Sequence, residues 1–457
     1  MGHVARAAVS AAWGSKPESP IYELEIESFD NEGRGVGHRE GKVIFVEGAL
    51  PGERVSCRIL RSKKNHELGE AVDILRRSSA REIPRCPHFG KCGGCSSQHL
   101  DLNSQIAAKQ RVLEDNLWHI GRIRSETILP AIHGPAWEYR HKARLSVRLV
   151  QKKGGVLVGF HERKSSFVAD MDSCEILPRR ISQLLRPLRE LIGALSIRDR
   201  LPQVELAIGE NVDVLVLRNL DEPTPGDAAA LAEFAADWGI QLWLQPAGPE
   251  SAYACFPPVA PALTYTLPEF GVEMPFMPTD FTQVNQQINR VLVKRAMQLL
   301  QPQPGERIAD LFCGLGNFTL PVARLGAAVV GVESNARLVE RARANALHNG
   351  LGELCEFTVG NLFETAVPAL AKIGKLDKVL IDPPREGALE LVKAMRASAP
   401  ERIVYVSCSP STLARDAGVL CHAGEPNPYK LTAAGVVNMF PHTSHVESIA
   451  VFELCPT

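Results

Sequence analysis

The last third of the chain alternates apolar runs with amphipathic segments in a regular order. Runs rich in Ile, Leu and Val lie at residues 306–313, 327–333, 355–361, 375–382 and 401–408. Helix-like segments lie at residues 316–326, 334–350 and 386–397. This order predicts a doubly wound, mostly parallel sheet. Because ligands of such sheets bind beyond the carboxyl ends of the strands, we expect the functional residues there.

A glycine turn follows the first of these runs and suits a nucleoside-type ligand. Gly314 and Gly316 come after ADLFC, and Glu333 ends the next run, nineteen residues after Gly314. Glycines let a ligand approach the backbone, and an acid at the next strand end can accept two ribose hydroxyls. The turn is not G-x-G-x-x-G, which favours a ligand such as S-adenosylmethionine over a dinucleotide. Asn361 and Asp382 would line the same crevice; a nicotinamide site and a merely tight connection are the alternatives.

Two residues near the C-terminus are candidates for covalent chemistry. Cys408 ends the run ERIVYVSC, and a thiol at a strand end in a ligand crevice is a candidate nucleophile. Glu447 precedes an apolar run and is a candidate general base. Taken alone, the cysteine could serve packing and the carboxylate could be solvated.

Five motifs of this region together resemble the RNA uracil-5-methyltransferase family. They are DFTQVN, DLFCGLGNF, IDPPR, VSCSP and HVESIAVFEL, which occur in that order between residues 275 and 457. The resemblance implies a Rossmann-like class I methyltransferase domain over residues 276–457, with Cys408 as nucleophile and Glu447 as base. It implies that S-adenosylmethionine contacts Gln283, Phe312, Asn317, Glu333, Asn361 and Asp382. RNA enzymes that make 5-methylcytosine usually carry a cysteine in the Asp-Pro motif, and IDPPR has none, so uracil is the preferred substrate.

The N-terminal region has the pattern of a small β-barrel. Short alternating runs begin at Ile21, and NEGRGVG predicts a glycine-rich turn between the first two. Between Arg58 and Arg85, eight basic residues accompany four acidic ones, which favours a phosphate-facing surface over a solvated strand face. Residues 20–80 resemble a TRAM domain, an OB-like RNA-binding barrel. Residues 1–19 read as a disordered leader and not as a signal peptide.

Three cysteines lie close together in the stretch CPHFGKCGGC. Cys86, Cys92 and Cys95 are followed by an isolated Cys174, and in a reducing compartment such thiols favour a metal over disulfides. From the residues alone, four thiolates admit either a [4Fe-4S] cluster or a tetrahedral zinc. The family resemblance implies a structural [4Fe-4S] cluster, because the barrel and this cysteine pattern accompany the methyltransferase domain in the 23S ribosomal RNA members. It also implies that the tRNA members lack both barrel and cluster.

Residues 81–275 are expected to form a central α+β domain. The pattern predicts a helix at residues 101–117 and, within 137–150, a basic strand face. Four basic residues recur on that face: Arg140, Lys142, Arg144 and Arg148. A long helix is predicted within residues 280–300, with Asp280 or Thr282 as its cap.

The charge and hydropathy of the chain set limits on its partners. The formal net charge is -1, so a nucleic-acid partner has to be argued from local basic patches. No run of about eighteen apolar residues is present, so we expect a cytoplasmic protein without membrane spans. The leading hypothesis is S-adenosylmethionine-dependent methylation of C5 of one uridine in 23S ribosomal RNA through a covalent cysteine–C6 adduct, by a monomer without an obligate protein partner. The alternatives are a tRNA uracil-5-methyltransferase and a non-catalytic RNA-binding or chaperone protein with the same fold.

Overall fold

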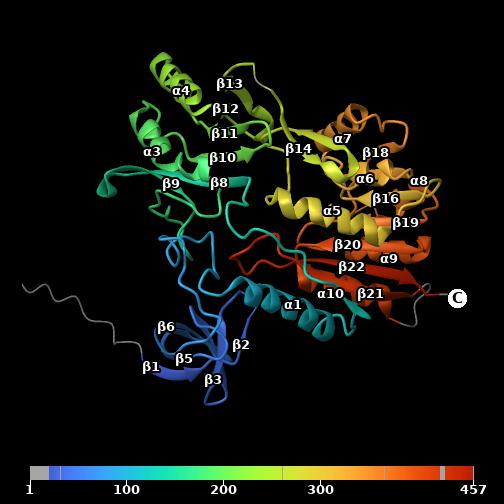
Figure 1. Cartoon of the computed structure of the whole chain (residues 1–457), viewed down its shortest axis with the longest axis horizontal. Helices are drawn as coiled ribbons and strands as arrows, with labels where there is room; N and C mark the ends of the chain where they lie inside the picture. The colour runs from blue at the N-terminus through green and yellow to red at the C-terminus, as the bar shows by residue number, and fades with distance from the viewer. Residues whose placement is uncertain (1–19, 31, 260, 365, 423–427, 456–457) are drawn as a thin grey trace, which may run out of the picture. The chain divides into compact units, whose positions relative to one another are not determined.

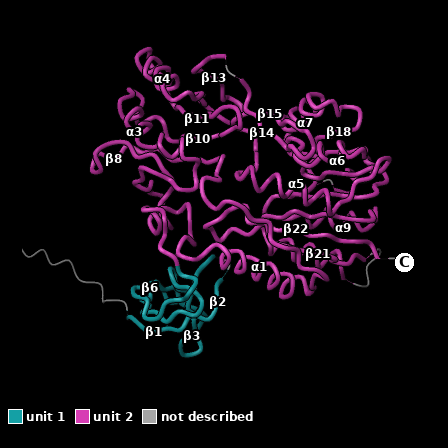
Figure 2. The backbone as a smooth tube through the Cα atoms, viewed as in Figure 1, with its two compact units in different colours: residues 1–81 teal, residues 82–457 magenta. Residues whose placement is uncertain are grey.

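The computed structural model describes residues 20–455 except 31, 260, 365 and 423–427 (Figure 1). The leader expected at residues 1–19 lies outside these. The chain divides into two compact units, residues 1–81 and residues 82–457 (Figure 2). The boundary expected at residue 275 falls inside the second unit and stays a prediction.

The N-terminal unit is built on one six-stranded sheet of order β1-β5-β6-β4-β3-β2. Its strands are β1 (Ile21–Glu25), β2 (Ser28–Phe29), β3 (Gly35–Arg39), β4 (Lys42–Glu47), β5 (Arg54–Ser62) and β6 (His66–Arg76). β1 pairs with β5, whereas β2 pairs with β3, so consecutive segments of chain form both edges of this sheet. The strands expected in this region are therefore confirmed.

The glycine-rich turn is shorter than the sequence predicts, because β3 already begins at Gly35. A Cβ atom at Gly35 would lie 2.7 Å from Cγ2 of Ile26, and one at Gly37 would lie 2.7 Å from the carbonyl oxygen of Glu25. These two glycines therefore serve the close approach of a neighbouring segment and not a change of direction.

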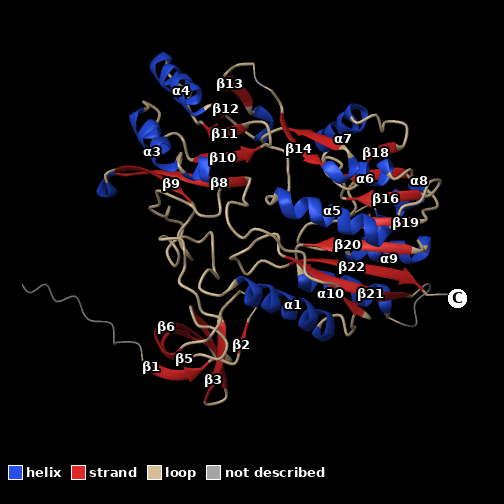
Figure 3. Cartoon of the chain, in the orientation of Figure 1, coloured by secondary structure: helices blue, strands red, loops and turns tan. Residues whose placement is uncertain are grey.

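The second unit contains a mixed six-stranded sheet of order β13-β12-β11-β10-β8-β9. Its strands are β8 (Lys142–Val150), β9 (Gly155–Gly159), β10 (Gln203–Ile208), β11 (Asp213–Arg218), β12 (Gln241–Gln245) and β13 (Tyr253–Phe256). The accompanying helices are α2 (Arg179–Ser182), α3 (Leu185–Ala194) and α4 (Pro225–Trp238), and the hairpin β14 (Leu263–Leu267) with β15 (Val272–Phe276) follows. This region has the expected α+β character (Figure 3).

The same unit contains an eight-stranded sheet of order β18-β17-β16-β19-β20-β22-β21-β7. Its strands are β7 (Thr127–Ile128), β16 (Arg307–Leu311), β17 (Ala328–Glu333), β18 (Cys355–Val359), β19 (Lys378–Ile381), β20 (Arg402–Ser407), β21 (Tyr429–Val437) and β22 (Glu447–Leu454). The five strands from β18 to β20 are parallel, which confirms the doubly wound core. β22 runs antiparallel to β20, and β7 comes from a much earlier part of the chain.

Helices cover both faces of this sheet, as the alternating pattern predicts (Figure 3). They are α1 (Leu102–His119), α5 (Gln286–Leu300), α6 (Thr319–Arg324), α7 (Ala336–His348), α8 (Ala366–Ile373), α9 (Leu389–Ser398) and α10 (Pro410–Cys421). α1 packs against α10 and β21, although it precedes the central sheet in the sequence. Because α1 and β7 both join the C-terminal sheet, the chain before residue 275 and the chain after it form one unit.

The helix predicted to be capped by Asp280 or Thr282 begins later than expected. α5 starts at Gln286, and the side chain of Asn285 accepts a hydrogen bond from the backbone N–H of Ile288. The carboxylate of Asp280 instead accepts from the backbone N–H of Met277 at 2.8 Å, so it closes a turn and cannot cap the helix.

Candidate active site

Six of the eight predicted catalytic and cofactor residues lie at one edge of the eight-stranded sheet. It is the edge where the parallel strands end and β22 begins (Figure 1). Glu333 is the last residue of β17, and Glu447 is the first residue of β22. The others directly follow a strand or lie two residues beyond it: Phe312 after β16, Asn361 after β18, Asp382 after β19 and Cys408 after β20. The sheet therefore gathers residues that are up to 135 positions apart in the sequence at a common edge.

Cys408 and Glu447 are neighbours across two adjacent strands. Ser407 lies opposite Ser448 in the β20–β22 ladder, so the next position places Cys408 opposite Glu447. Glu447 is only 6% exposed, and its Oε2 atom has no hydrogen-bond partner among the described residues. A thiol therefore lies beside a buried carboxyl group that has an unused oxygen.

The turn after β16 is strained and close to the acid at the end of β17. Phe312 has a φ of 68°, a conformation that costs a non-glycine residue about 1–3 kcal/mol. Its N–H donates to the carbonyl of Val332 at 2.9 Å. The N–H of Gly314 donates to a carboxylate oxygen of Glu333 at 3.2 Å. The turn thus holds Phe312 and Glu333 together at the strand ends, as the glycine pattern predicts.

Two residues that the sequence analysis missed fix the side chain of Asn317. Its Oδ1 accepts from the hydroxyl of Tyr265 and from the amide of Asn289, both at 2.9 Å, and its Nδ2 donates back to Asn289 at 3.0 Å. Tyr265 lies on β14 and Asn289 on the buried face of α5. A buried asparagine on an otherwise apolar helix face was the available signal for Asn289.

Gln283 comes from a separate segment that precedes α5. The N–H of His141 donates to the carbonyl of Val284 at 2.7 Å and holds this segment against the central sheet. Gln283 is partly buried. No hydrogen bond of its side chain is recorded among the described residues, so its contact with a cofactor stays a prediction.

Carboxyl groups accumulate at this edge and repel one another. Burial, together with Asp310, raises the pKa of Asp382 to about 7. Burial raises the pKa of Asp310 itself to about 7, and burial together with Asp382 raises the pKa of Glu447 to about 8. A cationic ligand would stabilise the ionised forms of these acids. The edge is therefore suited to a positively charged molecule such as a sulfonium compound.

The same carboxyl groups act on the candidate nucleophile. Burial, followed by the charges of Glu447 and Asp382, raises the pKa of the Cys408 thiol to about 11, whereas Arg385 opposes the increase. A nucleophilic cysteine needs the thiolate form. A cation bound between these acids would offset their repulsion, so ligand binding is expected to activate the thiol.

The loop that precedes Glu447, residues 438–446, is called the catalytic loop below. The backbone N–H groups of Ser96 and Ser97 donate to the carbonyl of His442 at 2.9 Å and 3.0 Å. The N–H of Ser444 donates to the hydroxyl of Ser96 at 2.9 Å. Ser96 directly follows Cys95, so the segment that carries three of the four clustered cysteines also holds the catalytic loop.

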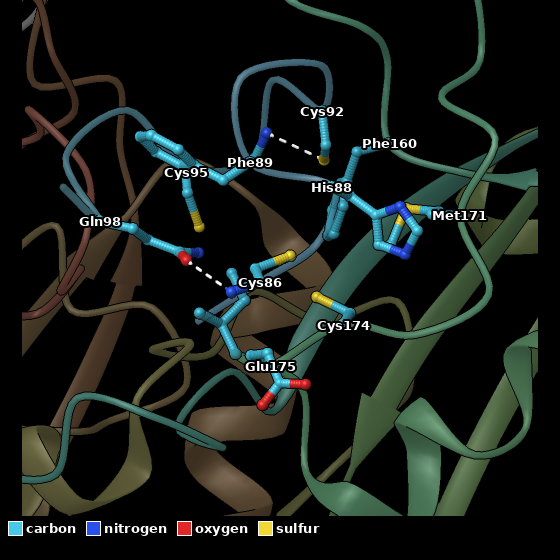
Figure 4. A pocket seen from close by; sticks show the side chains of 12 residues that line it. Cys86, His88, Phe89, Cys92, Cys95, Gln98, Phe160, Met171, Cys174 and Glu175 are labelled. Carbon is cyan, nitrogen blue, oxygen red and sulfur yellow. Dashed lines mark hydrogen bonds between the residues drawn. The ribbon is translucent and has the colours of Figure 1, made fainter. Parts of the chain in front are cut away.

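The four cysteines predicted to bind a metal lie around one pocket that is partly open to solvent (Figure 4). Much of the remaining wall is apolar and comes from Phe89, Phe160, Met171 and Ile176. The N–H of Gly94 donates to the sulfur of Cys92 at 3.4 Å. Within the described part of the chain, no group of three or more His, Cys, Asp or Glu is arranged to hold a metal ion.

The chemistry of this pocket fits thiolate ligands of a cationic centre. Burial raises the pKa of Cys174 to about 11 and that of Cys95 to about 12, and the neighbouring cysteines add to both increases. The backbone N–H groups of Ile176 and Leu177 oppose the increase at Cys174 by hydrogen bonding to its sulfur. Cys92 and Cys174 are buried, and Cys86 and Cys95 are partly buried. Four such thiols can become thiolates together only beside a positive centre, and N–H groups directed at sulfur are usual around iron-sulfur clusters.

The basic strand face is only partly available to a ligand. Arg144 and Arg148 are exposed. The ammonium group of Lys142 instead donates to the carbonyls of Pro278 and Asp280, so this member of the predicted basic face is engaged internally. The side chain of Lys142 therefore has internal hydrogen-bond acceptors, although it belongs to the alternating basic pattern.

Among the described helices, none is both long and apolar enough to cross a membrane.

Two family models match the chain. The model described as tRNA (Uracil-5-)-methyltransferase matches residues 104–453, and the model of the TRAM domain matches residues 20–72. The first match includes the whole edge described above, together with most of α1 and the central sheet.

Individual relatives match over nearly the full length. The 23S rRNA (uracil(1939)-C(5))-methyltransferase RlmD of Aromatoleum aromaticum is 60% identical over 94% of this chain and 98% of that protein. The protein of the same name from Chromobacterium violaceum is 56% identical over 94% of this chain and 84% of that protein.

A solved structure resembles the whole fold. The crystal structure of Pyrococcus abyssi tRNA (uracil-54, C5)-methyltransferase in complex with S-adenosyl-L-homocysteine gives a TM-score of 0.71 at 25% identity. The match covers 94% of this chain and 99% of that chain, so the uncovered part of this chain is smaller than the N-terminal sheet. The expectation that tRNA enzymes of this kind lack a counterpart of the N-terminal barrel is therefore wrong, and this part of the chain does not by itself separate rRNA from tRNA substrates.

Proposed function

We propose that this chain, which belongs to the tRNA (uracil-5-)-methyltransferase family, methylates C5 of a uridine in 23S ribosomal RNA with S-adenosylmethionine as the methyl donor. The observation that carries the proposal is the pairing of Cys408 with Glu447 at the carboxylate-rich edge of the sheet. Relatives that are 56% to 60% identical carry this activity in their names. A non-catalytic role would not account for a partly exposed thiol beside a buried carboxyl group.

In the proposed reaction, Cys408 supplies the nucleophile that uracil lacks. Its thiolate adds to C6, and the electron pair of the C5–C6 bond moves into an enolate, which makes C5 nucleophilic. C5 then takes the methyl group from the sulfonium, and neutral S-adenosylhomocysteine remains. Glu447 removes the proton from C5, the double bond forms again, and the thiolate is expelled.

The timing of these steps favours Glu447 as the base. When Glu447 acts, the sulfonium charge has already been consumed, so no cofactor cation lowers the pKa of Glu447. The raised pKa of about 8 then gives a carboxylate of high basicity once it is ionised. We expect the elimination step to accelerate as the pH rises through this value, because only the ionised carboxylate accepts the proton.

The proposal assigns the cofactor to the carboxyl ends of β16, β17, β18 and β19. Six residues would contact S-adenosylmethionine: Gln283, Phe312, Asn317, Glu333, Asn361 and Asp382. Glu333 would accept the ribose hydroxyls, and the strained turn at Phe312 would leave room for the nucleoside. The reaction would take place in the cytoplasm on a monomeric enzyme.

The proposal also assigns a structural [4Fe-4S] cluster to Cys86, Cys92, Cys95 and Cys174. Their common pocket, its apolar wall and the N–H groups near sulfur support this assignment. The cluster would be held by four thiolates. Protein purified without oxygen should be brown and contain iron and acid-labile sulfide, whereas stoichiometric zinc without iron would contradict the assignment.

A tRNA substrate is the second candidate, and the likeness to the Pyrococcus abyssi tRNA enzyme favours it. The two substrates can be compared directly with fragments of 23S ribosomal RNA and with tRNA transcripts. Efficient methylation of the tRNA alone would replace the proposed substrate while leaving the proposed chemistry intact.

The chemistry is tested with RNA that carries 5-fluorouridine at the target position. Cys408 should add to C6 and the methyl group should transfer, but fluorine cannot leave C5 as a cation, so the enzyme should stay covalently bound to methylated RNA. The measurement is a band that resists denaturation and whose mass includes one methyl group.

Variants of the two catalytic candidates complete this test. Cys408→Ala should give no adduct, and its turnover should fall by at least about 10⁴-fold. Glu447→Gln should accumulate the adduct slowly even with ordinary uridine, because addition and methylation precede the step that it blocks. An equally strong band from Cys408→Ala would reject Cys408 as the nucleophile, and methylation of cytidine would reject uracil as the substrate.

A further inference from the structure

A lysine on α1 is buried against the start of the catalytic loop. Lys109 is 4% exposed, and its ammonium group donates to Oδ1 of Asn438 and to the carbonyl of Phe440, both at 2.8 Å. These bonds use two of its three N–H groups. Both acceptors are neutral, so they orient the ammonium group without compensating its charge.

The position of Lys109 relates it directly to Glu447. In the β21–β22 ladder, Val437 lies opposite Glu447, and Asn438 is the next residue of that strand. The ammonium group is therefore bonded to the residue that follows the cross-strand partner of Glu447. Oε2 of Glu447 is buried without a hydrogen-bond partner among the described residues. A buried carboxylate that lacks hydrogen bonds ionises only at a high energetic cost unless a positive charge is near.

We propose that Lys109 is a positioning residue for the general base: it fixes the catalytic loop and supplies the buried positive charge that allows Glu447 to ionise. The inference rests on the proposed function, since it takes Glu447 as the base. It adds a residue that lies outside the five motifs. Lys109 lies on α1, more than 300 positions before Glu447 in the sequence, and supplies the charge.

Charges from several elements act on Glu447, and their burial decides which of them dominates. Asp382 raises its pKa, whereas Lys109 and Arg385 lower it. Arg385 is exposed, so water screens its charge more strongly than that of the buried Lys109. His442 and His445 are neutral near pH 7, because burial lowers the pKa of each to about 4. Burial lowers the pKa of Lys109, whereas the charge of Glu447 raises it, so ionisation of Glu447 and retention of the ammonium form of Lys109 favour each other.

The decisive variant is Lys109→Met in the full-length protein. Adduct formation with 5-fluorouridine RNA should fall by no more than about threefold, the effect of the two lost bonds to the catalytic loop, because addition and methylation do not use the charge of Glu447. Turnover of ordinary uridine RNA at pH 7.5 should fall about tenfold or more, because loss of the charge shifts the ionisation of Glu447 by about one pH unit. The rising limb of the pH–rate profile should move to higher pH by the same amount, and Lys109→Arg should restore most of the turnover.

Two control variants separate charge from packing. Gln105→Leu removes uncharged contacts of the same helix face to the same loop, since the Gln105 amide accepts from the N–H of His442 at 2.8 Å and donates to the carbonyl of Ser97 at 3.1 Å. It should slow adduct formation and turnover alike and leave the pH profile in place. Lys378→Met removes another buried lysine, one paired with Glu306 at the opposite end of β19. It should lower the melting temperature without moving the pH profile.

The outcomes distinguish failure of this inference from failure of the proposed function. If Lys109→Met slows adduct formation and turnover equally and leaves the pH profile unchanged, Lys109 serves packing alone and the inference is overturned. The proposed function fails in a different experiment, namely when the wild-type enzyme forms no adduct with 5-fluorouridine RNA or when Glu447→Gln turns over normally.

Discussion

The two halves of the active edge are built in different ways. The half assigned to the cofactor comes almost entirely from residues 307–382, in which successive strand ends deliver Phe312, Glu333, Asn361 and Asp382. The half assigned to catalysis combines Cys408 and Glu447 with a loop that is held by Ser96, Ser97 and Lys109. The first half depends mainly on local strand and turn geometry, with Asn317 as the exception, and the second depends on contacts between distant parts of the chain.

Because the two halves are held by different contacts, a mutation is expected to affect only the half that it contacts. A change in the cysteine pocket should reach the catalytic loop, because Ser96 and Ser97 directly follow Cys95 and bond the carbonyl of His442. It should not reach the turn at Phe312, which is held by Val332 and Glu333. Catalysis and cofactor binding are therefore expected to respond separately to mutation.

Loss of one of the proposed cluster ligands should give the largest separation between the effects on catalysis and on cofactor binding. Cys174→Ala should abolish iron binding and lower methylation by about 100-fold, because a pocket without its metal would no longer fix Ser96 and Ser97 against the catalytic loop, and contacts that support a site are worth about 10- to 100-fold. The dissociation constant for S-adenosylhomocysteine, measured by calorimetry, should change by less than about threefold, since it reports on the half with local geometry.

A matched cysteine provides the control for this prediction. Cys255 lies on β13 of the same central region but does not line the pocket, so Cys255→Ala should keep its iron and its activity. Equal loss of cofactor affinity and of methylation in Cys174→Ala would break the comparison, because it would mean that both halves depend on the cysteine pocket.

The fold of the cofactor half was predictable because its signals are short in range. The βα alternation gave the parallel strands, and Gly314 and Glu333 marked the turn and its acid, which the structure joins at 3.2 Å. The residues that could not be predicted make contacts between parts of the chain that are distant in the sequence. Asn289 and Tyr265 bond Asn317 from α5 and from β14, and no local pattern connects those elements with the turn.

The catalytic half was predictable as a set of residues but not as an assembly. Cys408 and Glu447 stood out by their positions next to strands, yet the antiparallel pairing of β20 with β22 is what makes them neighbours. The contributions of α1 and of the segment after Cys95 could not be predicted, because hydrogen bonds to backbone carbonyls, such as that of His442, leave no residue signature in the sequence.

Disruption of the Asn317 network should affect the cofactor half alone, with an intermediate effect. Asn289→Leu removes the reciprocal amide pair and leaves the partly buried amide of Asn317 with fewer partners, which costs about 1 kcal/mol. We expect the affinity for S-adenosylmethionine to fall by about tenfold, while the turnover at saturating cofactor stays within about twofold of wild type. A lowered turnover with unchanged affinity would show that Asn289 supports the catalytic half instead.

The smallest effect is expected from mutations in the exposed part of the basic strand β8, which belongs to neither half. Arg144 and Arg148 project from β8, and Arg144 has one long ion pair of 3.4 Å to Glu205, so their charges are available to phosphates. Replacing both with Ala should weaken RNA binding a few-fold and reduce the slope of log affinity against log salt by about one for each phosphate that the variant no longer neutralises. The affinity for S-adenosylmethionine should not change.

An exposed arginine on α3 is the reference for this effect. Arg186 is paired with Glu190 on the same helix and is 78% exposed at its side chain, so Arg186→Ala removes an equivalent charge from a different surface. If Arg186→Ala reduces the salt slope as much as the β8 variant does, the RNA responds to total charge and not to the β8 face. If only the β8 variant reduces the slope, and turnover at saturating RNA is unchanged, β8 contributes to RNA binding independently of both halves of the active edge.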